Sequence, residues 1–298
     1  MVNPYIFREY DIRGVAEKDF PDEIIYKLGK TLGTYFTRKD IHKIALGRDC
    51  RLSSPRLHQA LSHGLLDTGC HIIDLSIVPT PLLYFALFNL EVDGGVMITG
   101  SHNPPDNNGF KVCVGKSTIF GEEIQFLRKL FERGEFETGK GTIKSQDIKP
   151  SYLKTVSSFL KMGKQKRKVI IDSGNGTAGI VAGPFYRSLG VGVSELFSEM
   201  DGTFPNHHPD PTVPVNLTSL IAEVKRQKAD VGIGFDGDAD RIGVVDEQGK
   251  IIWGDQLMVL FSRAILAEFP GATFIAEVKC SQTLFDDIKK HGGKAIMW

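Results

Sequence analysis

Short apolar runs alternate with polar turns and amphipathic stretches along the chain. The first three apolar runs, residues 43–49, 71–78 and 94–99, have the length and composition of buried strands. Residues 53–69 carry serines and a proline at the start, leucines at four-residue spacing and a closing glycine, which together indicate a helix. A second helix is expected over 79–90. Strands that alternate with helices in this way predict a layered α/β fold with a largely parallel sheet.

The same alternation returns further along the chain. Its predicted elements are the strands 168–176, 191–197 and 230–235, the helices 179–190 and 217–228, and the hairpin 242–253. A third start consists of the strand 273–282, the helix 283–293 and the strand 294–298. We therefore expect an internal repeat of one α/β unit, with two copies and the start of a third. The polar, Gly-rich segment 134–150 suits the boundary between the first two copies.

Polar loops follow the strands 94–99 and 230–235. In open α/β sheets, ligands collect beyond the carboxyl ends of the strands. The two loops are therefore expected to face one cleft shared between the units.

Charge and cysteine usage exclude several classes of protein. The chain has 36 Lys+Arg and 36 Asp+Glu, so no overall field attracts nucleic acid or an anionic membrane. No apolar run has the length of a membrane span. The four cysteines form no Cys-x-x-Cys pair, which argues against a zinc site or a disulfide framework and for a reducing, cytoplasmic setting. Residues 1–11 include acidic side chains and lack the apolar core of a signal peptide.

The segment 234–243, GFDGDADRIG, places Asp236, Asp238 and Asp240 at alternate positions. Three carboxylates so close together repel one another unless a cation lies among them. Carboxylate oxygens favour Mg²⁺ or Ca²⁺ over metals with softer ligands. Because one short segment supplies few ligands and leaves coordination positions open, the pattern favours Mg²⁺, which keeps waters and meets phosphates.

Two other interpretations of this segment stay open. One is a Ca²⁺-binding EF-hand loop, because the D-x-D-x-D spacing fits and Glu247 lies at the twelfth position. Against it, Arg241 stands at the sixth position, where that loop needs glycine, and the flanking residues resemble strands. The other interpretation is an acidic surface turn.

The first polar loop, residues 100–111, reads GSHNPPDNNGFK. Ser101 has no evident His–Asp partners, and the loop does not match the G-x-S-x-G elbow of hydrolases. A serine near a Mg²⁺ site favours phosphoryl transfer instead. Lys111 ends the loop, and a lysine held near cations can have a lowered pKa and transfer a proton. An ordinary Asn/Pro/Gly turn remains the alternative.

Three further polar segments carry a weaker signal. Residues 7–14, FREYDIRG, combine two arginines with a tyrosine, which suits bidentate phosphate contacts or equally a solvated arm. Residues 172–176, DSGNG, could present backbone N–H groups to an anion, although a plain turn is more common. His207 and His208 lie in a stiff loop and are more typical of surface residues than of metal ligands.

Taken together, TGSHNP with NGFK, DGDADR and FREYDIRG resemble the α-D-phosphohexomutase family, and its bacterial phosphomannomutase/phosphoglucomutase branch in particular. The stretches 201–211 and 277–282 are also similar to that branch, so the resemblance covers essentially the whole chain. It implies repeated three-layer α/β/α domains with mixed, mainly parallel sheets around a shared cleft. The implied ranges are domain I over 1–148, domain II over 149–251 and the first part of domain III over 252–298.

The resemblance also implies an activity. Ser101 would be a phosphoserine that exchanges its phosphoryl group with a hexose phosphate through a sugar 1,6-bisphosphate, so that 1-phosphate and 6-phosphate interconvert. By the same resemblance the metal ligands for Mg²⁺ are Ser101, Asp236, Asp238 and Asp240; the catalytic residues are Ser101, Lys111, His102 and Arg13; and the substrate-binding residues are Tyr10, Arg241 and Lys279.

The family's sugar-binding loop of the third domain and phosphate-binding loop of the fourth are not found in these 298 residues. We therefore expect a truncated chain that binds Mg²⁺ but turns over weakly or not at all, since the remote phosphate positions the reacting end. The expected partner is a hexose phosphate of mannose or glucose, without nucleic acid or membrane, bound by a monomer or weak homo-oligomer. A phosphoglucosamine mutase, a Mg²⁺-dependent phosphatase and an inactive metal-binding relative stay open, although phosphoglucosamine mutases usually carry an NGIK-like form of residues 108–111.

Overall fold

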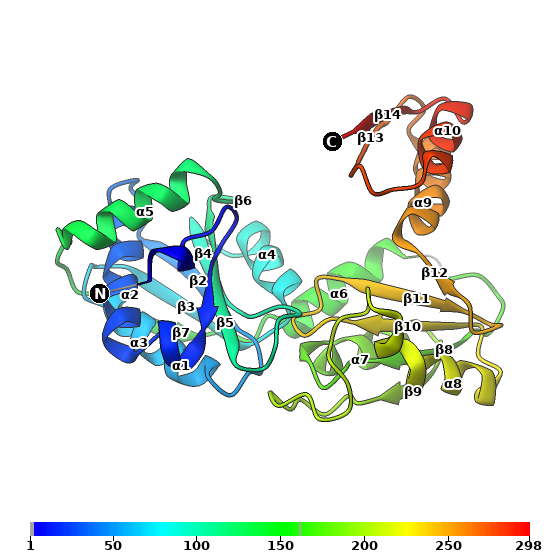
Figure 1. The fold of residues 1–298 in the computed structure, drawn as a ribbon, viewed down its shortest axis with the longest axis horizontal. Helices are drawn as coiled ribbons and strands as arrows, with labels where there is room; N and C mark the ends of the chain where they lie inside the picture. Colours follow the sequence, from blue (N-terminus) through cyan, green and yellow to red (C-terminus); the bar gives the residue numbers. More distant parts are fainter. Residues whose placement is uncertain (1–2, 161) are drawn as a thin grey trace.

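The computed structural model describes residues 3–160 and 162–298, and Figure 1 shows three α/β units in chain order. Met1 and Val2, included in the predicted first domain and in the comparison with signal peptides, lie outside the described residues. The α/β class predicted from the alternating pattern is confirmed. Within the described part of the chain, no helix combines the length and the apolar character needed to cross a membrane.

The first unit contains a seven-stranded mixed sheet in the order β1-β5-β4-β2-β3-β7, with β6 beside β5. Its strands are β1 (Ile12–Val15), β2 (Lys43–Arg48), β3 (His71–Ile77), β4 (Gly94–Ile98), β5 (Asn107–Val114), β6 (Ser117–Thr118) and β7 (Ile143–Ser145). Its helices are the short 3₁₀ helix η1 (Pro4–Ile6), α1 (Ala16–Asp19), α2 (Asp22–Thr37), α3 (Ser54–Leu66), α4 (Thr80–Asn89) and α5 (Glu122–Arg133).

Both faces of this sheet are buried. On β2, Ile44 and Leu46 pack with the apolar residues of α2, α3 and α5, whereas Ala45 between them packs with those of α4. The apolar strands are therefore covered by helices on both sides, which gives the three-layer arrangement.

The second unit repeats this plan with five strands in the order β12-β11-β10-β8-β9. Its strands are β8 (Lys168–Asp172), β9 (Gly192–Leu196), β10 (Val231–Phe235), β11 (Ile242–Asp246) and β12 (Ile251–Ile252). Its helices are α6 (Lys149–Phe159), η2 (Thr177–Ile180), α7 (Ala182–Ser188), η3 (Pro214–Leu217) and α8 (Thr218–Gln227). In both sheets the strand before the polar loop has one parallel and one antiparallel neighbour: β4 lies between β2 (parallel) and β5 (antiparallel), and β10 lies between β8 (parallel) and β11 (antiparallel). The loops after β4 and β10 are thus equivalent parts of a repeat.

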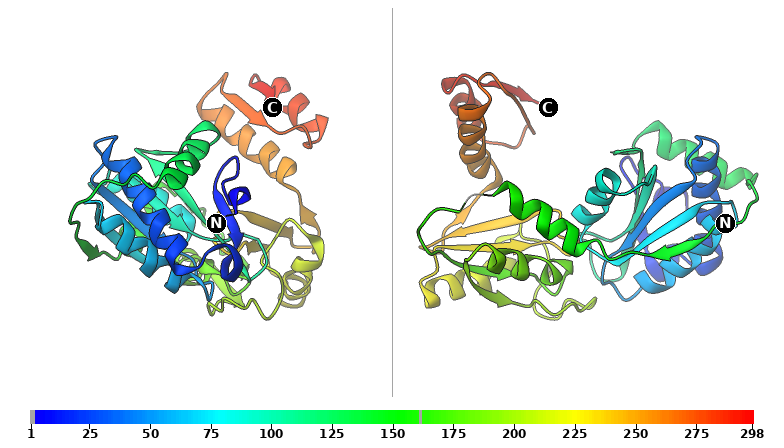
Figure 2. Two further views of the ribbon diagram at one scale, coloured as in Figure 1. Left: turned by 60° about the vertical axis from the view of Figure 1, so that its left-hand side comes forward. Right: turned by 180° about the vertical axis from the view of Figure 1, so that it is seen from behind.

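The third unit is small. It consists of α9 (Gly254–Glu268), β13 (Thr273–Ala276), α10 (Gln282–Lys290) and β14 (Lys294–Met297), with β13 and β14 parallel. Its core is built around Leu266, Phe274, Leu284 and Ile288. Figures 1 and 2 show that the third unit is joined to the second unit where α9 begins and lies apart from the first unit.

Several details differ from the expectations. The strand predicted over 273–282 ends at Ala276, because the chain turns at Glu277, whose carbonyl accepts from the Cys280 amide at 3.1 Å. The helix predicted over 179–190 is α-helical only over Ala182–Ser188 and follows a 3₁₀ turn. The boundary segment 134–150 contains β7, an edge strand that pairs with β3, and the start of α6. The antiparallel strand β5 begins inside the supposed loop, so Lys111 lies within a strand. The exact domain boundaries stay a prediction.

Candidate metal centre and serine loop

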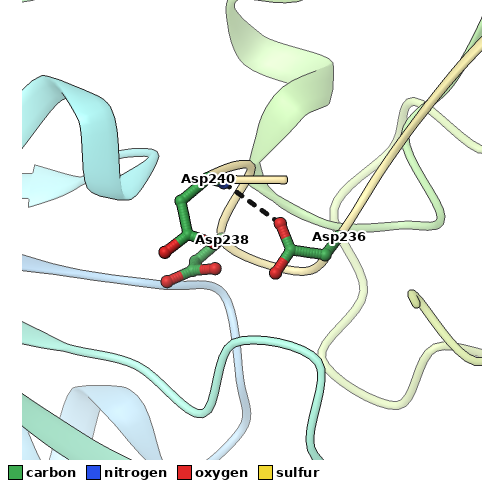
Figure 3. Close-up of side chains that lie close together, drawn as sticks. All are labelled: Asp236, Asp238 and Asp240. Atoms are coloured by element: carbon green, nitrogen blue, oxygen red, sulfur yellow. Dashed lines mark hydrogen bonds between the residues drawn. The ribbon is translucent and has the colours of Figure 1, made fainter. Parts of the chain in front are cut away.

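Asp236, Asp238 and Asp240 lie on the short connection between β10 and β11, and Figure 3 shows their carboxylates gathered around one space. One oxygen from each residue lies within 4.8 Å of the others. The loop is shaped by Asp236, whose Oδ1 accepts the amides of Asp240 at 3.0 Å and Arg241 at 3.1 Å. Ala239 has φ 57°, a left-handed conformation that lets the chain turn back within so few residues.

The carboxylates of this cluster are only partly neutralised. Oδ2 of the buried Asp238 accepts from Thr80 Oγ1 at 2.6 Å, Thr99 Oγ1 at 3.1 Å and Lys111 Nζ at 3.1 Å. Its other oxygen, Oδ1, is buried and has no hydrogen-bond partner among the described residues. Burial, with the charges of Asp238 and Asp240, raises the pKa of Asp236 to about 8. An orphaned carboxylate oxygen beside two further carboxylates is a donor set suited to a hard divalent cation.

The serine loop after β4 meets this cluster directly. The buried Ser101 donates its hydroxyl to Asp236 Oδ2 at 2.9 Å. Its backbone is left-handed, with φ 50°, and its amide donates to Thr99 Oγ1 at 2.9 Å. The approach of the two loops depends on Gly237, since a Cβ there would lie 2.6 Å from the Ser101 carbonyl oxygen. Residues of two different units are thereby brought into hydrogen-bond contact.

Four cationic or ionisable side chains border the serine and the aspartates. Arg13 lies on β1 opposite Gly109 and donates to Asn103 of the serine loop at 3.2 Å. His102 Nδ1 lies 3.3 Å from Ser101 Oγ, and burial together with Arg241 lowers the pKa of the ring. The partly exposed Arg241 approaches Asp240 at 3.9 Å.

Lys111 is the fourth. Its ammonium group contacts Asp238 at 3.1 Å and Asp240 at 2.5 Å. Burial lowers the pKa of this amine, but the two carboxylates outweigh burial and raise it above its ordinary value. The expected lowering of the Lys111 pKa is therefore wrong for this structure, because carboxylates rather than cations surround the ammonium group.

The structure does not bring Tyr10 and Lys279 into this contact network. The Tyr10 ring is 72% exposed in the turn before β1. Lys279 lies in the third unit, after β13, where it pairs with Glu277 at 3.4 Å and lines a cavity of about 540 Å³ together with Trp253 and Asp255.

The structure also bears on the EF-hand interpretation, on the loop after β8 and on His207. Glu247 is exposed in the turn at the far end of β11, and the aspartate loop is flanked by antiparallel strands rather than helices, which contradicts the EF-hand interpretation. In the loop after β8, Gly176 packs against Gly237 and so supports the aspartate loop. His207 is half-buried and pairs with the buried Asp172 at 3.1 Å, so it is not a free surface residue.

Four residues that contact the site were not identified from the sequence: Asp49, Arg51, Thr80 and Thr99. Thr80 begins α4 and, besides its hydroxyl contact, donates its amide to the Asp238 carbonyl at 2.9 Å. Asp49 and Arg51 follow the carboxyl end of β2, just as the serine and aspartate loops follow β4 and β10. That shared position at a strand end was the available signal.

Comparison with known proteins agrees with this arrangement. Residues 4–138 match the family described as phosphoglucomutase/phosphomannomutase, alpha/beta/alpha domain I, and residues 150–249 match its alpha/beta/alpha domain II. The chain is 46% identical over 293 residues to the phosphomannomutase/phosphoglucomutase of Pseudomonas aeruginosa, covering 98% of this chain and 63% of the relative. It is 47% identical over 294 residues to the phosphoglucomutase of Neisseria meningitidis, covering 98% of this chain and 64% of the relative.

A solved structure is also similar. The crystal structure of a phosphoglucomutase/phosphomannomutase family protein from Burkholderia thailandensis superimposes with a TM-score of 0.96 at 39% identity. The match covers 100% of this chain and 67% of that chain. The chain thus spans a little under two thirds of the length of the curated relatives, 63% and 64% for the two named above.

Proposed function

The chain belongs to the phosphoglucomutase/phosphomannomutase family, and we propose that it takes part in interconverting hexose 1-phosphate and hexose 6-phosphate through a phosphoserine at Ser101. The observation that carries this proposal is the 2.9 Å hydrogen bond from Ser101 Oγ to Asp236. It places a hydroxyl at the edge of three carboxylates that lack enough counter-charge. A phosphoryl group on that oxygen would meet a cation held by the same carboxylates.

Mg²⁺ fits the donor set of this site. Asp236, Asp238 and Asp240 would hold it, and the unpartnered Asp238 Oδ1 offers a ligand atom that no other described group uses. When bound, Mg²⁺ would neutralise charge on the transferring phosphoryl group. A phosphoserine oxygen at Ser101 would complete the proposed ligand set.

The ionisable side chains around the metal cluster suit phosphate binding and proton transfer. Arg13, beside the serine loop, and Arg241, beside Asp240, would hold the phosphate that is transferred. His102 and Lys111 would move the proton of the reacting hydroxyl, since both lie within contact of Ser101 or of the aspartates. Tyr10 and Lys279 are assigned to the sugar only by resemblance, and both are exposed.

An assay with α-glucose 1-phosphate, Mg²⁺ and glucose 1,6-bisphosphate tests the proposal. Formation of glucose 6-phosphate that disappears in Ser101→Ala supports a mutase, whereas release of free phosphate would favour the phosphatase alternative. Parallel assays with mannose 1-phosphate and glucosamine 1-phosphate compare the substrates. A sensitive coupled detection of product is used in each assay.

A further inference from the structure

Arg51 lies directly beneath the serine loop and has a fully buried side chain. It comes from the turn after β2, and its guanidinium group reaches the loop between β4 and β5. A fully buried arginine is rare and needs a hydrogen-bond partner for each of its donors. The structure supplies all of them.

The five N–H donors of Arg51 have five acceptors. Nη2 donates to the carbonyl oxygens of Ser101 at 2.8 Å and Asn103 at 2.7 Å. Nη1 donates to those of Pro104 at 2.5 Å and Asn107 at 3.0 Å. Nε donates to the carboxylate of Asp49 at 3.1 Å. One side chain therefore fixes four carbonyl groups along the serine loop.

Asp49 adds further hydrogen bonds to the network around Arg51. Its carboxylate accepts from the Gly100 amide at 3.1 Å, and also from the hydroxyl of Ser54 at 2.5 Å and from the Arg51 amide at 3.1 Å. The buried charges of Arg51 and Asp49 neutralise each other. The pair therefore lacks the net charge needed to attract a phosphate, and its hydrogen bonds to the serine loop are all to backbone groups.

Gly100 allows the guanidinium group to lie against the loop. A Cβ at this position would stand 2.4 Å from Arg51 Cζ and 2.4 Å from Nε. On another side the Phe204 ring of the second unit lies 5.2 Å from Cζ. Arg51 is thus held between the serine loop and the neighbouring unit.

Ser101 needs this support because its backbone is left-handed, with φ 50°. Such a conformation is unfavourable for a residue with a side chain, and it persists only where contacts with neighbouring groups hold the backbone in place. Arg51 fixes the Ser101 carbonyl, while Thr99 fixes its amide. A lysine at position 51 would have three donors without the planar fork and could not replace these contacts.

We propose that Arg51, with Asp49, is the positioning residue that holds Ser101 Oγ in the orientation required for phosphoryl transfer. This inference rests on the proposed phosphorylation of Ser101. Misplacement of a reacting group by about 1 Å can cost about 100-fold in rate. The loss should appear in the transfer step, because Arg51 contacts neither the carboxylates of the metal cluster nor a group that would bind the sugar.

The test compares Arg51→Lys with Arg56→Lys. Arg56 is a matched control, because it also donates to backbone carbonyls, those of Phe20 and Ala16, but lies on α3 away from the serine loop. Each protein is mixed with glucose 1,6-bisphosphate and Mg²⁺, and phosphorylation is followed by intact-mass spectrometry over a range of bisphosphate concentrations. Mn²⁺ affinity and amide hydrogen exchange of residues 99–107 are measured on the same samples.

For Arg51→Lys we expect the maximal rate of phosphorylation to fall about 10- to 100-fold. The half-saturating bisphosphate concentration and the Mn²⁺ affinity should stay close to wild type, and residues 99–107 should exchange faster. Arg56→Lys should match wild type in each measurement. If Arg51→Lys does not fold, Asp49→Asn should show a smaller change in the same direction.

Equal maximal rates for the two arginine variants, or unchanged exchange of residues 99–107, would overturn the proposal. If wild type and Ser101→Ala are equally unphosphorylated, the proposed function fails instead. In that case the exchange of residues 99–107 still decides whether Arg51 holds the loop.

Discussion

Ser101 and Asp236 are 135 residues apart in the chain, yet the hydroxyl of the first donates to the carboxylate of the second across 2.9 Å. Ser101 follows β4 of the first unit and Asp236 follows β10 of the second. The internal repeat places an equivalent loop at the same strand end of each sheet, and the two loops carry different chemistry. One supplies a hydroxyl group and the other supplies carboxylates, so neither unit contains the candidate site alone.

Replacement of Asp238 by Asn should abolish most metal binding. The change removes one negative charge and keeps the shape of the side chain. The three donors around Oδ2 should hold the remaining amide oxygen there, so an NH₂ group replaces the orphaned Oδ1. Because even outer-shell partners of a metal are worth about 10- to 100-fold in affinity, we expect at least that loss for Mn²⁺ in a calorimetric titration. Glu247→Gln is the control and should bind as wild type. A loss of affinity in Glu247→Gln instead would restore the EF-hand interpretation.

Replacement of Gly237 by Ala should separate the two loops. The added Cβ would lie 2.6 Å from the Ser101 carbonyl oxygen, although the backbone angle itself suits alanine. Overpacking of this kind typically costs about 1–3 kcal/mol in the free energy of unfolding. Urea denaturation should show that loss, while Gly254→Ala should change stability little, because no described residue apart from its chain neighbours lies within 4 Å of the new Cβ. Equal stabilities of the two variants would refute the close approach.

Thr80 should stabilise the contact between the first two units. Its hydroxyl donates to the buried Asp238 at 2.6 Å, and a hydrogen bond to a charged group contributes about 1.5–3 kcal/mol. Thr80→Val should lower the free energy of unfolding in EDTA by about 2 kcal/mol. Thr80→Ser keeps the hydroxyl and should retain most of that stability. If Thr80→Ser is destabilised while Thr80→Val is not, the methyl packing rather than the hydrogen bond is responsible.

The pair of His207 and Asp172 should make stability depend on pH. Burial lowers the pKa of His207, but the hydrogen bond and charge of Asp172 outweigh burial, so the pKa is raised above its ordinary value of 6.5. A raised folded-state pKa means that the stabilisation is complete below pH 6.5 and is lost as the pH rises through the folded-state pKa. The difference in unfolding free energy between wild type and His207→Gln should therefore shrink from pH 5.5 to pH 8.5 (about one unit below and two above the histidine pKa). A constant difference would show that folding leaves the pKa of His207 unchanged, and a difference that grows with pH would show that folding lowers it.

Much of the fold and part of the site could be predicted from the sequence. Apolar runs located β2, β3 and β4 to within a residue or two, because strands buried on both faces have continuous apolar sequences. The repeated order of these runs placed the serine and aspartate loops at equivalent strand ends. Strand β5 was missed because its polar start, Asn107 to Gly109, resembles a turn.

The remaining features depend on tertiary contacts. Arg51 is fully buried, whereas composition predicts an exposed arginine, so its role could not be inferred without its five acceptors. The pKa of Lys111 depends on Asp238 and Asp240, which approach it from 127 and 129 residues away. Local sequence carries no information on the distance between such groups.

The most direct test of the proposed phosphoserine is the mass of the chain after incubation with glucose 1,6-bisphosphate and Mg²⁺. Wild type should gain a single phosphoryl group, located at Ser101 by peptide mapping, and both Ser101→Ala and Asp238→Asn should remain unmodified. A wild-type chain that stays unmodified, or a Ser101→Ala variant that gains the same mass, would contradict the proposal.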